Sequence, residues 1–320
     1  NLGFMGMMTS PKWDGGGMDT ISYSIAIEEI SRADASAGVI MSVNNSLVCY
    51  LLEKYASDML KEKYLKPLAL GSKLGAFSLS EPQSGSDASN MKTQAVKKKD
   101  HYVINGTKNW VTNGIHSDYV VLFAVTTPNI GHRGVSCFII EKGFPGLTIG
   151  PEEKKLGIKG SSTVTLFFEN CEVPKENILG NIGQGAAIAF NVLYVGRYKL
   201  GAVTAGGAKY AVEGAYDYAK EREQFNRPIT EFGMIQKKFV NMVINCWEAD
   251  CLNYMTTGSI DKALEGVSKK DEDYFEIVQS TIEDHGIEAS LCKVVGSETL
   301  QRTVDEGLQI YGGAGFIEEY

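Results

Sequence analysis

The chain has 320 residues, of which 43% are hydrophobic and 22% are charged, a globular composition that excludes a disordered or fibrous protein. Its length exceeds what one ordinary core needs, so we expect more than one domain. A formal net charge of −8 argues against a general polyanion-binding surface, although a local basic site for one phosphorylated ligand is compatible with it.

The sequence also gives expectations about membranes, metals and compartment. No stretch approaches the roughly 20 apolar residues that a membrane span requires. The segment 1–5 has no charged leader before an apolar run, so we expect no signal peptide. The six cysteines form no Cys-x-x-Cys pair and only four histidines are present, which favours reduced thiols and no metal site. We expect a bacterial cytoplasmic or mitochondrial matrix protein without nucleic-acid binding.

Taken in chain order, the hydrophobic pattern changes twice. Helical spacing of apolar residues predicts helices within residues 1–72. Between 73 and 177 the period becomes two, and the segments 119–123, 135–140 and 163–168 read as strands. The dipeptides Asn105-Gly106 and Asn113-Gly114 each predict a hairpin, so an antiparallel sheet or barrel is expected. From 178 to 320 the helical period returns, with a charged, solvated connection at 262–273.

Two motifs of the middle region allow a functional and a structural interpretation. The loop Ser78–Asp87 carries hydroxyl groups, a proline and a glycine, which suit either a polar ligand or an ordinary turn. Trp110 and Thr112 alternate along a predicted strand and would share one face. They would either hold a planar cofactor or belong to the core.

Three further motifs lie in the C-terminal helical region. Arg222 follows a long helix and would either reach a pyrophosphate or interact with the helix dipole. The glycine-rich segment 309–316 is either a phosphate-contacting turn or a helix C-cap. Arg197 stands in an apolar helix and needs an ion pair or a polar ligand.

In this order, the motifs resemble those of the acyl-CoA dehydrogenase family of flavoproteins, in particular its short-chain, butyryl-CoA dehydrogenase-like members. The resemblance covers residues 2–320. The six matching segments are Leu79–Asp87, Asn105–Asn113, Lys155–Ser161, Val173–Gly180, Arg222–Phe225 and Gln309–Phe316. Six motifs in one order are far more specific than any one of them.

The resemblance implies an α+β multidomain fold with a helical N-terminal domain (1–72), a central antiparallel β-barrel (73–177) and an incomplete C-terminal four-helix bundle (178–320). It implies FAD between barrel and bundle, completed by a neighbouring subunit of a dimer of dimers. It also implies dehydrogenation of short- to medium-chain acyl-CoA to 2-enoyl-CoA, with electrons passed to an electron-transferring flavoprotein.

Site residues follow from the same resemblance. The flavin and its phosphates would be contacted by Phe77, Leu79, Ser80, Gly85, Ser86, Trp110, Val111 and Thr112. The neighbouring subunit's cofactor would be held by Arg222, Gln224, Phe225, Ile229, Phe232, Gln309, Gly312 and Gly313. The CoA part of the substrate would be contacted by Ser86, His132, Arg133, Tyr194 and Arg197.

The chain also departs from the family pattern. The family's general-base glutamate is expected beyond Tyr320, and the alternative base position on the long helix is Gly196, which cannot act. Gly233 replaces a frequent glutamine, and Val39 and Val43 either close the acyl pocket or pack generically. An enoyl-CoA reductase, an acyl-CoA oxidase and a non-catalytic flavin- and acyl-CoA-binding module remain as alternatives.

Overall fold

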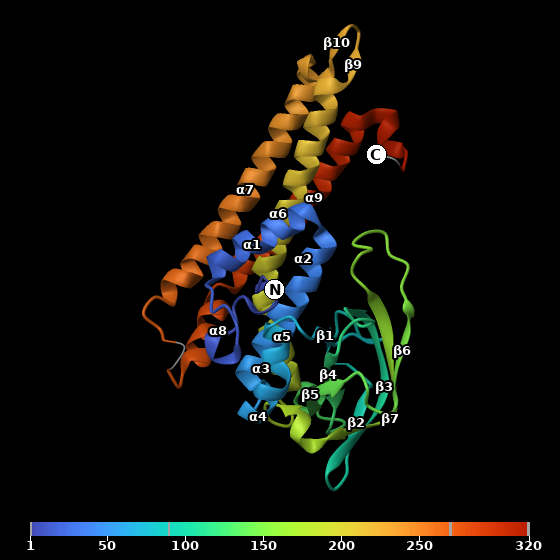
Figure 1. Ribbon diagram of the computed structural model, residues 1–320, viewed down its shortest axis with the longest axis vertical. Coiled ribbons are helices and arrows are strands. Elements are labelled where there is room, and N and C mark those ends of the chain that lie inside the picture. Colours follow the sequence, from blue (N-terminus) through green and yellow to red (C-terminus); the bar gives the residue numbers. More distant parts are fainter. Residues whose placement is uncertain (1, 89, 269–270, 319–320) are drawn as a thin grey trace. The chain divides into compact units, whose positions relative to one another are not determined.

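The computed structural model describes residues 2–88, 90–268 and 271–318 and divides into two compact units (Figure 1). Unit 1 comprises Asn1–Asp19, Val39–Gly196 and Lys269–Phe275, and unit 2 comprises Thr20–Gly38, Arg197–Ser268 and Glu276–Tyr320. Residues 1–72 are therefore shared between the units. The predicted domain boundaries after residues 72 and 177 stay a prediction.

The helical part of unit 1 surrounds a segment of π-helix. The end of α2 (Ala35–Ser42) continues through the π-helical Val43–Cys49 into α3 (Tyr50–Tyr55), followed by α4 (Asp58–Leu60) and α5 (Lys66–Ala69). Asn44 is fully buried; its amide donates to the Met5 carbonyl at 2.8 Å and its Oδ1 accepts from Gly75 N–H at 2.9 Å. The π-helical segment therefore holds the N-terminal segment and the first strand in place.

The β-part of unit 1 is one mixed sheet. Its strands are β1 (Gly75–Ser78), β2 (Gln94–Lys97), β3 (His101–Thr112), β4 (Tyr119–Val125), β5 (Val135–Glu141), β6 (Leu147–Glu152), β7 (Thr163–Pro174) and β8 (Ile178–Leu179). They follow the order β6-β7-β3-β2-β4-β5-β8, with β1 beside β4. Apolar side chains from both faces of β4 and β5 enter separate cores, which include Val121 on one side and Leu122 on the other.

The sheet corrects two expectations. The predicted antiparallel barrel is wrong, because β1 and β2 both pair with β4 in parallel and the strand order leaves β6 and β8 as edges. Neither Asn-Gly dipeptide closes a hairpin. Asn105-Gly106 lies inside β3 at a register shift against β7, and Asn113-Gly114 ends β3 before a strand that does not pair with it. At Asn105-Gly106 long-range pairing outweighs the local turn preference, whereas Asn113-Gly114 keeps its turn, which leads to a strand other than the partner of β3.

Unit 2 is helical. It contains α1 (Thr20–Ala33), the larger part of α6 (Gly185–Glu221), α7 (Gly233–Ala263), most of α8 (Tyr274–Asp284) and α9 (Gly286–Tyr311). A two-stranded turn of β9 (Glu223–Gln224) and β10 (Arg227–Pro228) connects α6 to α7 at one end of these helices (Figure 1). Small residues permit close approach: a Cβ on Gly201 would lie 3.0 Å from atoms of Asn253 and Cys292.

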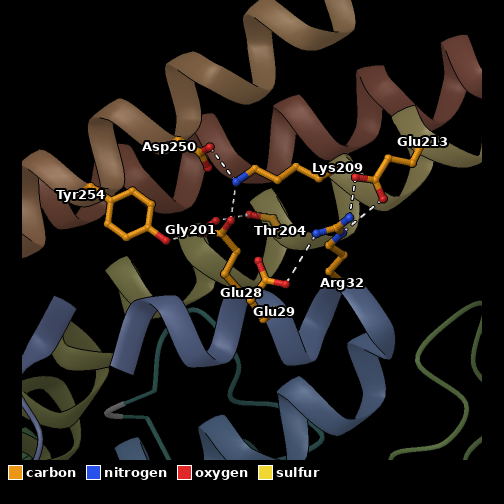
Figure 2. A network of polar contacts seen from close by, with 9 residues as sticks. All are labelled: Glu28, Glu29, Arg32, Gly201, Thr204, Lys209, Glu213, Asp250 and Tyr254. Carbon is orange, nitrogen blue, oxygen red and sulfur yellow. Dashed lines mark hydrogen bonds and ion pairs between the residues drawn. The ribbon is translucent and has the colours of Figure 1, made fainter. Parts of the chain in front are cut away.

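A polar network connects α1, α6 and α7 inside unit 2 (Figure 2). Lys209 of α6 forms ion pairs with Glu28 of α1 and with Asp250 of α7, the latter at 2.7 Å. The Tyr254 hydroxyl donates to Glu28 at 2.6 Å. Burial raises the pKa of the Asp250 carboxyl. The network joins the three helices, and the buried Glu28 carboxylate in particular must keep its partners.

One helical run bears on the expectation about membrane spans, which stays a prediction. Among the described residues, the helical run Ala35–Tyr55, 21 residues long, is long and apolar enough to cross a membrane by length and composition. However, 67% of its apolar window is buried inside the protein, as in a core helix. This run is therefore only weak evidence for a membrane span.

Candidate functional site

A pocket of about 350 Å³ in unit 1 collects residues of four segments. Its lining consists of Val43, Leu47, Phe77, Leu79, Ser80, Gly85, Ser86, Ala88, Asn109, Trp110, Thr112, Phe190 and Leu193. Seven of the eight residues predicted to contact the flavin from this region are among them. The structure thus brings the loop after β1 and the end of β3 to one place.

Trp110 stands out within this pocket because of its backbone. Its φ is 59°, a left-handed conformation that is an outlier for a bulky residue, and its side chain is 61% exposed. The β3–β7 register shifts between Lys108 and Val111, so Trp110 lies in a bulge. Bulges re-aim side chains beside functional sites, and strain of this kind points to a binding role. The alternative of a core tryptophan is excluded.

Trp110 and Thr112 face the same pocket, as alternation predicts, and the departure from alternation is at Asn109, next to Trp110. Thr112 lines the pocket, while Val111 is fully buried in the core on the other side of the sheet. Asn109 also lines the pocket and donates its backbone N–H to the Ser80 carbonyl at 2.9 Å. This hydrogen bond joins the bulge to the loop that forms the opposite wall.

A buried ion pair lies behind the same loop. Lys108 Nζ is 2.8 Å from Glu81 Oε1, and the two side chains are 0% and 2% exposed. Burial lowers the pKa of the Lys108 ammonium to about 8, although Glu81 counteracts this shift. Burial alone would raise the pKa of Glu81, but the charge of Lys108 and hydrogen bonds from Lys92 and Thr93 lower it overall. At neutral pH both members are charged.

The lowered pKa of Glu81 predicts acid sensitivity of unit 1. Its folded value lies below the ordinary 4.5, so its stabilising contribution is present above that pH and is lost as the pH falls through the folded value. We expect the free energy of unfolding to fall between about pH 6 and pH 3, with a shallower slope in Glu81→Gln. Denaturant unfolding across this range measures both slopes, and equal slopes would contradict the assignment.

Some slope remains in that variant for a known reason. The carboxyl groups of Asp118 and Glu141 also have lowered pKa values, because Lys73 and Lys63 outweigh the effect of burial. Both groups lie in unit 1 outside the pocket. The difference between the slopes, and not the wild-type slope itself, therefore reports on Glu81.

A second pocket, of about 510 Å³, lies in unit 2 where α6 meets α9 and the β9–β10 turn. Its lining consists of Tyr218, Arg222, Gln224, Phe225, Ile229, Phe232, Ile235, Ile310, Tyr311, Gly312, Gly313 and Ala314. Seven of the eight residues predicted to hold the partner's cofactor are among them. A cation, aromatic rings and an open glycine turn suit a diphosphate joined to a flat base.

The turn between β9 and β10 exposes an aromatic ring. Phe225 and Asn226 have φ values of 55° and 62°, and the Phe225 side chain is 87% exposed. Two left-handed residues close a tight hairpin whose twist matches its strands. The Arg227 guanidinium lies 4.1 Å from the centre of the Phe232 ring and braces the turn. An exposed, strained phenylalanine points to a ligand or partner contact.

The glycine-rich end of α9 divides the predicted residues. Gly312 adopts φ 60° and ψ −133°, a conformation that favours glycine, and a Cβ on Gly312 or Gly313 would meet nothing within 4 Å. Gln309 lies elsewhere, in a groove of about 660 Å³ with Lys238, Arg302 and Glu306. The structure therefore separates Gln309 from the two glycines, and its predicted contact with the same cofactor stays a prediction.

The predicted CoA contacts are scattered. Ser86 lines the unit 1 pocket, whereas His132 and Arg133 are exposed in the 3-10 turn Gly131–Gly134 after β4. Tyr194 and Arg197 lie on α6, and neither is among the pocket-lining residues. Arg197 donates to the Ser290 hydroxyl of α9 at 3.2 Å, so it has a partner within the chain. These roles stay predictions.

Sequence reasoning missed several pocket residues. Asn109 lies inside the motif Asn105–Asn113, and Ala88 directly follows the loop Ser78–Asp87. The position of each beside a predicted site residue was the signal that could have identified it. Phe190 and Leu193 come from α6, a helix whose apolar spacing does not reveal which side faces a ligand. Together with Val43 and Leu47 they give one side of the pocket an apolar surface.

The residues present fit FAD. In unit 1, an exposed strained tryptophan, the hydroxyl groups of Ser80 and Thr112 and an apolar side surround a pocket. A Cβ on Gly85 would meet nothing within 4 Å, so the chain leaves room beside that backbone for a ligand. In unit 2, Arg222 supplies the cation that a diphosphate needs. Among the described residues, no group of three His, Cys, Asp or Glu side chains would hold a metal.

Three family domains match the chain. They are the N-terminal domain of acyl-CoA dehydrogenase over residues 1–72, the middle domain over 76–171 and the C-terminal domain over 183–320. A Bacillus subtilis acyl-CoA dehydrogenase is 40% identical over 318 residues, covering 99% of this chain and 79% of that protein. The human mitochondrial short-chain specific acyl-CoA dehydrogenase is 37% identical, covering 99% of this chain and 73% of that protein.

Another Bacillus subtilis protein, described as a probable acyl-CoA dehydrogenase, is 41% identical, and the chain spans 53% of its length. Solved structures agree. Butyryl-CoA dehydrogenase from Megasphaera elsdenii has a TM-score of 0.90 at 36% identity, covering 100% of this chain and 79% of that one. Acyl-CoA dehydrogenase complexed with FAD from Bacillus anthracis has a TM-score of 0.94 at 42% identity, covering 100% and 55%.

These matches confirm the family resemblance. The chain belongs to the acyl-CoA dehydrogenase family, with the N-terminal helical, middle β and C-terminal helical arrangement of that fold. It is a flavoprotein of an oxidoreductase class that acts on CH–CH donors, and its cofactor is FAD.

Proposed function

We propose that the protein to which this chain belongs dehydrogenates short- to medium-chain acyl-CoA thioesters to 2-enoyl-CoA. The observation that carries the proposal is the unit 1 pocket, which combines the strained Trp110, the Thr112 hydroxyl and an apolar side. The short-chain preference is supported by the relatives named for short-chain substrates.

Each group in the pocket has a part in this proposal. FAD, when bound, supplies the acceptor for the hydride that leaves the β-carbon of the thioester. Trp110 would pack on the flavin, Thr112 would donate a hydrogen bond to it, and Leu47 and Leu193 would exclude water from the acyl chain. No carboxylate is among the residues lining this pocket in the described part of the chain. The general base beyond Tyr320 stays a prediction.

The second pocket suits the diphosphate and adenosine of FAD, which we propose it binds for a neighbouring subunit in a dimer or a dimer of dimers. Arg222 and Phe225 support this proposal, because both line the pocket and both are exposed. A bound ligand would cover the Phe225 ring, which is otherwise in contact with water. We also propose an electron-transferring flavoprotein as the electron acceptor. A structure named for the electron transferring flavoprotein of Acidaminococcus fermentans matches with a TM-score of 0.90 at 37% identity, over 99% of this chain and 79% of that one.

Cofactor and acyl-CoA titrations test the function. The purified protein, incubated with excess FAD and freed of unbound flavin, is expected to be yellow, and butyryl-CoA is expected to shift its visible band at lower concentration than palmitoyl-CoA. A protein that stays colourless would overturn the proposal. Yellow protein without any response to acyl-CoA would leave the flavin site but refute the substrate class.

One alternative has a specific observation in its favour. Since the pocket-lining residues that the structure describes include no carboxylate, a flavin- and acyl-CoA-binding module without turnover is a second candidate. Anaerobic mixing of the full-length protein with butyryl-CoA separates the two, since bleaching of the flavin indicates turnover. Rapid reoxidation by air would instead favour an oxidase.

A further inference from the structure

We propose that the buried Glu81–Lys108 pair is a positioning device for the two walls of the unit 1 pocket, and that flavin affinity depends on it. Neither side chain lines the pocket, and both lie directly behind residues that do. The inference rests on the proposed function, because it takes this pocket as the flavin site.

The first wall is the bulge at the end of β3. Lys108 lies two residues before Trp110, at the position where the register with β7 shifts. Its ammonium donates to Glu81 Oε1 at 2.8 Å and to the Leu79 carbonyl at 2.9 Å. Lys108 therefore joins the strand that carries Trp110 to the loop that carries Leu79 and Ser80.

The second wall is the loop between β1 and β2. The Glu81 carboxylate accepts backbone N–H groups from Lys92 at 2.6 Å and from Thr93 at 3.0 Å, so one side chain fixes both ends of this loop. Glu81 and Ser84 also exchange two backbone hydrogen bonds, at 2.9 and 3.0 Å. Gly85, Ser86 and Ala88, which line the pocket, lie between these fixed points.

Stability alone does not explain such a pair. Removing two charges from water costs free energy that their mutual attraction offsets only in part, and uncharged residues of similar volume commonly stabilise a fold equally well. What the ions add is directional contacts. The Lys108 ammonium and the Glu81 carboxylate together make six hydrogen bonds, of which one joins the two groups to each other. Besides those described above, the six include one from the Gln83 amide to Glu81 at 2.6 Å and one from Lys108 to the Met91 sulfur at 3.8 Å. Apolar substitutes would keep the volume and lose the alignment of both walls.

The test separates folding from flavin binding. Lys108→Met alone leaves Glu81 buried and unpaired, so it is expected to lower the thermal midpoint and FAD retention together. The double variant Glu81→Gln/Lys108→Met removes both charges. It is expected to recover most of the thermal midpoint while its Kd for FAD stays weaker by on the order of tenfold, with a changed visible circular dichroism of the flavin.

The control is Lys63→Met, which breaks the more exposed Lys63–Glu141 pair (2.7 Å) in the same unit; neither of its members lines the pocket. Its FAD affinity and flavin spectrum are expected to equal those of the wild type. An equal loss of affinity in the control would overturn the proposal, because the effect would then not depend on the pair behind the pocket walls.

Two further outcomes decide the matter. A folded double variant with wild-type Kd and flavin spectrum would overturn the positioning role, whereas a wild-type protein that binds no FAD would overturn the proposed function itself. If the double variant does not fold, Glu81→Gln serves in its place, since it keeps the shape of Glu81. Unchanged FAD affinity and spectrum in that variant would refute the proposal.

Discussion

Arg222→Ala is expected to weaken FAD binding by about 10- to 150-fold, because a hydrogen bond to a charged group contributes about 1.5–3 kcal/mol. Arg222 is exposed directly after the end of α6 and lines the unit 2 pocket together with four aromatic side chains. Its backbone carbonyl accepts from Ile229 N–H at 2.8 Å, so the turn keeps its anchor in the variant. Titration of flavin-free protein with FAD measures the effect.

Lys220→Ala is the matched control for this prediction. Lys220 is an exposed cation two residues earlier, in the last turn of α6 beside the ring of Tyr216, and it does not line the pocket. Loss of Lys220 is expected to leave FAD affinity within about twofold, since an exposed charge outside the pocket is screened. Arg222→Lys should recover part of the affinity, because it keeps the charge but not the planar fork. Equal affinities of wild type and Arg222→Ala would refute the diphosphate role.

Gly206→Ala is expected to lower the free energy of unfolding of unit 2 by about 1–3 kcal/mol through overpacking. A Cβ at Gly206 would lie 2.2 Å from the Glu28 carbonyl oxygen and 3.1 Å from Arg32 N, both backbone atoms of α1. Backbone atoms cannot rotate away, so α1 and α6 would have to separate. The separation would also stretch the network in which Lys209 joins Glu28 to Asp250.

The adjacent glycine provides the control. A Cβ at Gly207 meets only the flexible end of Leu300, at 3.4 Å, which is ordinary contact. Gly207→Ala is therefore expected to be neutral or stabilising by up to about 1 kcal/mol, as alanine is in a helix interior. Chemical unfolding of both variants, followed by far-ultraviolet circular dichroism, makes the comparison. A stable Gly206→Ala variant would show that the helices do not approach as described.

The change of hydrophobic period along the chain was sufficient to predict the order of helical, β and helical regions, because periodicity depends only on which side of an element is buried. Strand pairing was beyond its reach. Gly106 belongs to a β3 that pairs with β2 on one side and with β7, some 60 residues further along, on the other. A Cβ there would lie 2.4 Å from Thr93 Oγ1, so glycine serves close packing at this bulge and not a turn.

The candidate site shows the same division. Motif residues such as Ser80 and Arg222 were predicted, because the residue type alone shows which functional group each one carries. The left-handed backbone of Trp110 was not, because an even alternation was assumed through β3. The position of Gln309 also escaped, because residues three apart in sequence diverge once Gly312 ends α9. The local sequence identifies the functional groups, whereas bulges and helix ends determine the direction in which the side chains point.

The conformation of Trp110 has a consequence for any attempt to engineer this protein. A tryptophan with φ 59° carries a backbone penalty of roughly 1–3 kcal/mol, which glycine at the same position would not have. Trp110→Gly is thus a substitution that a screen for heat resistance would reward while it removes the ring facing the pocket. Thermal stability and activity therefore trade off at this residue, and a screen for stability must also select for activity.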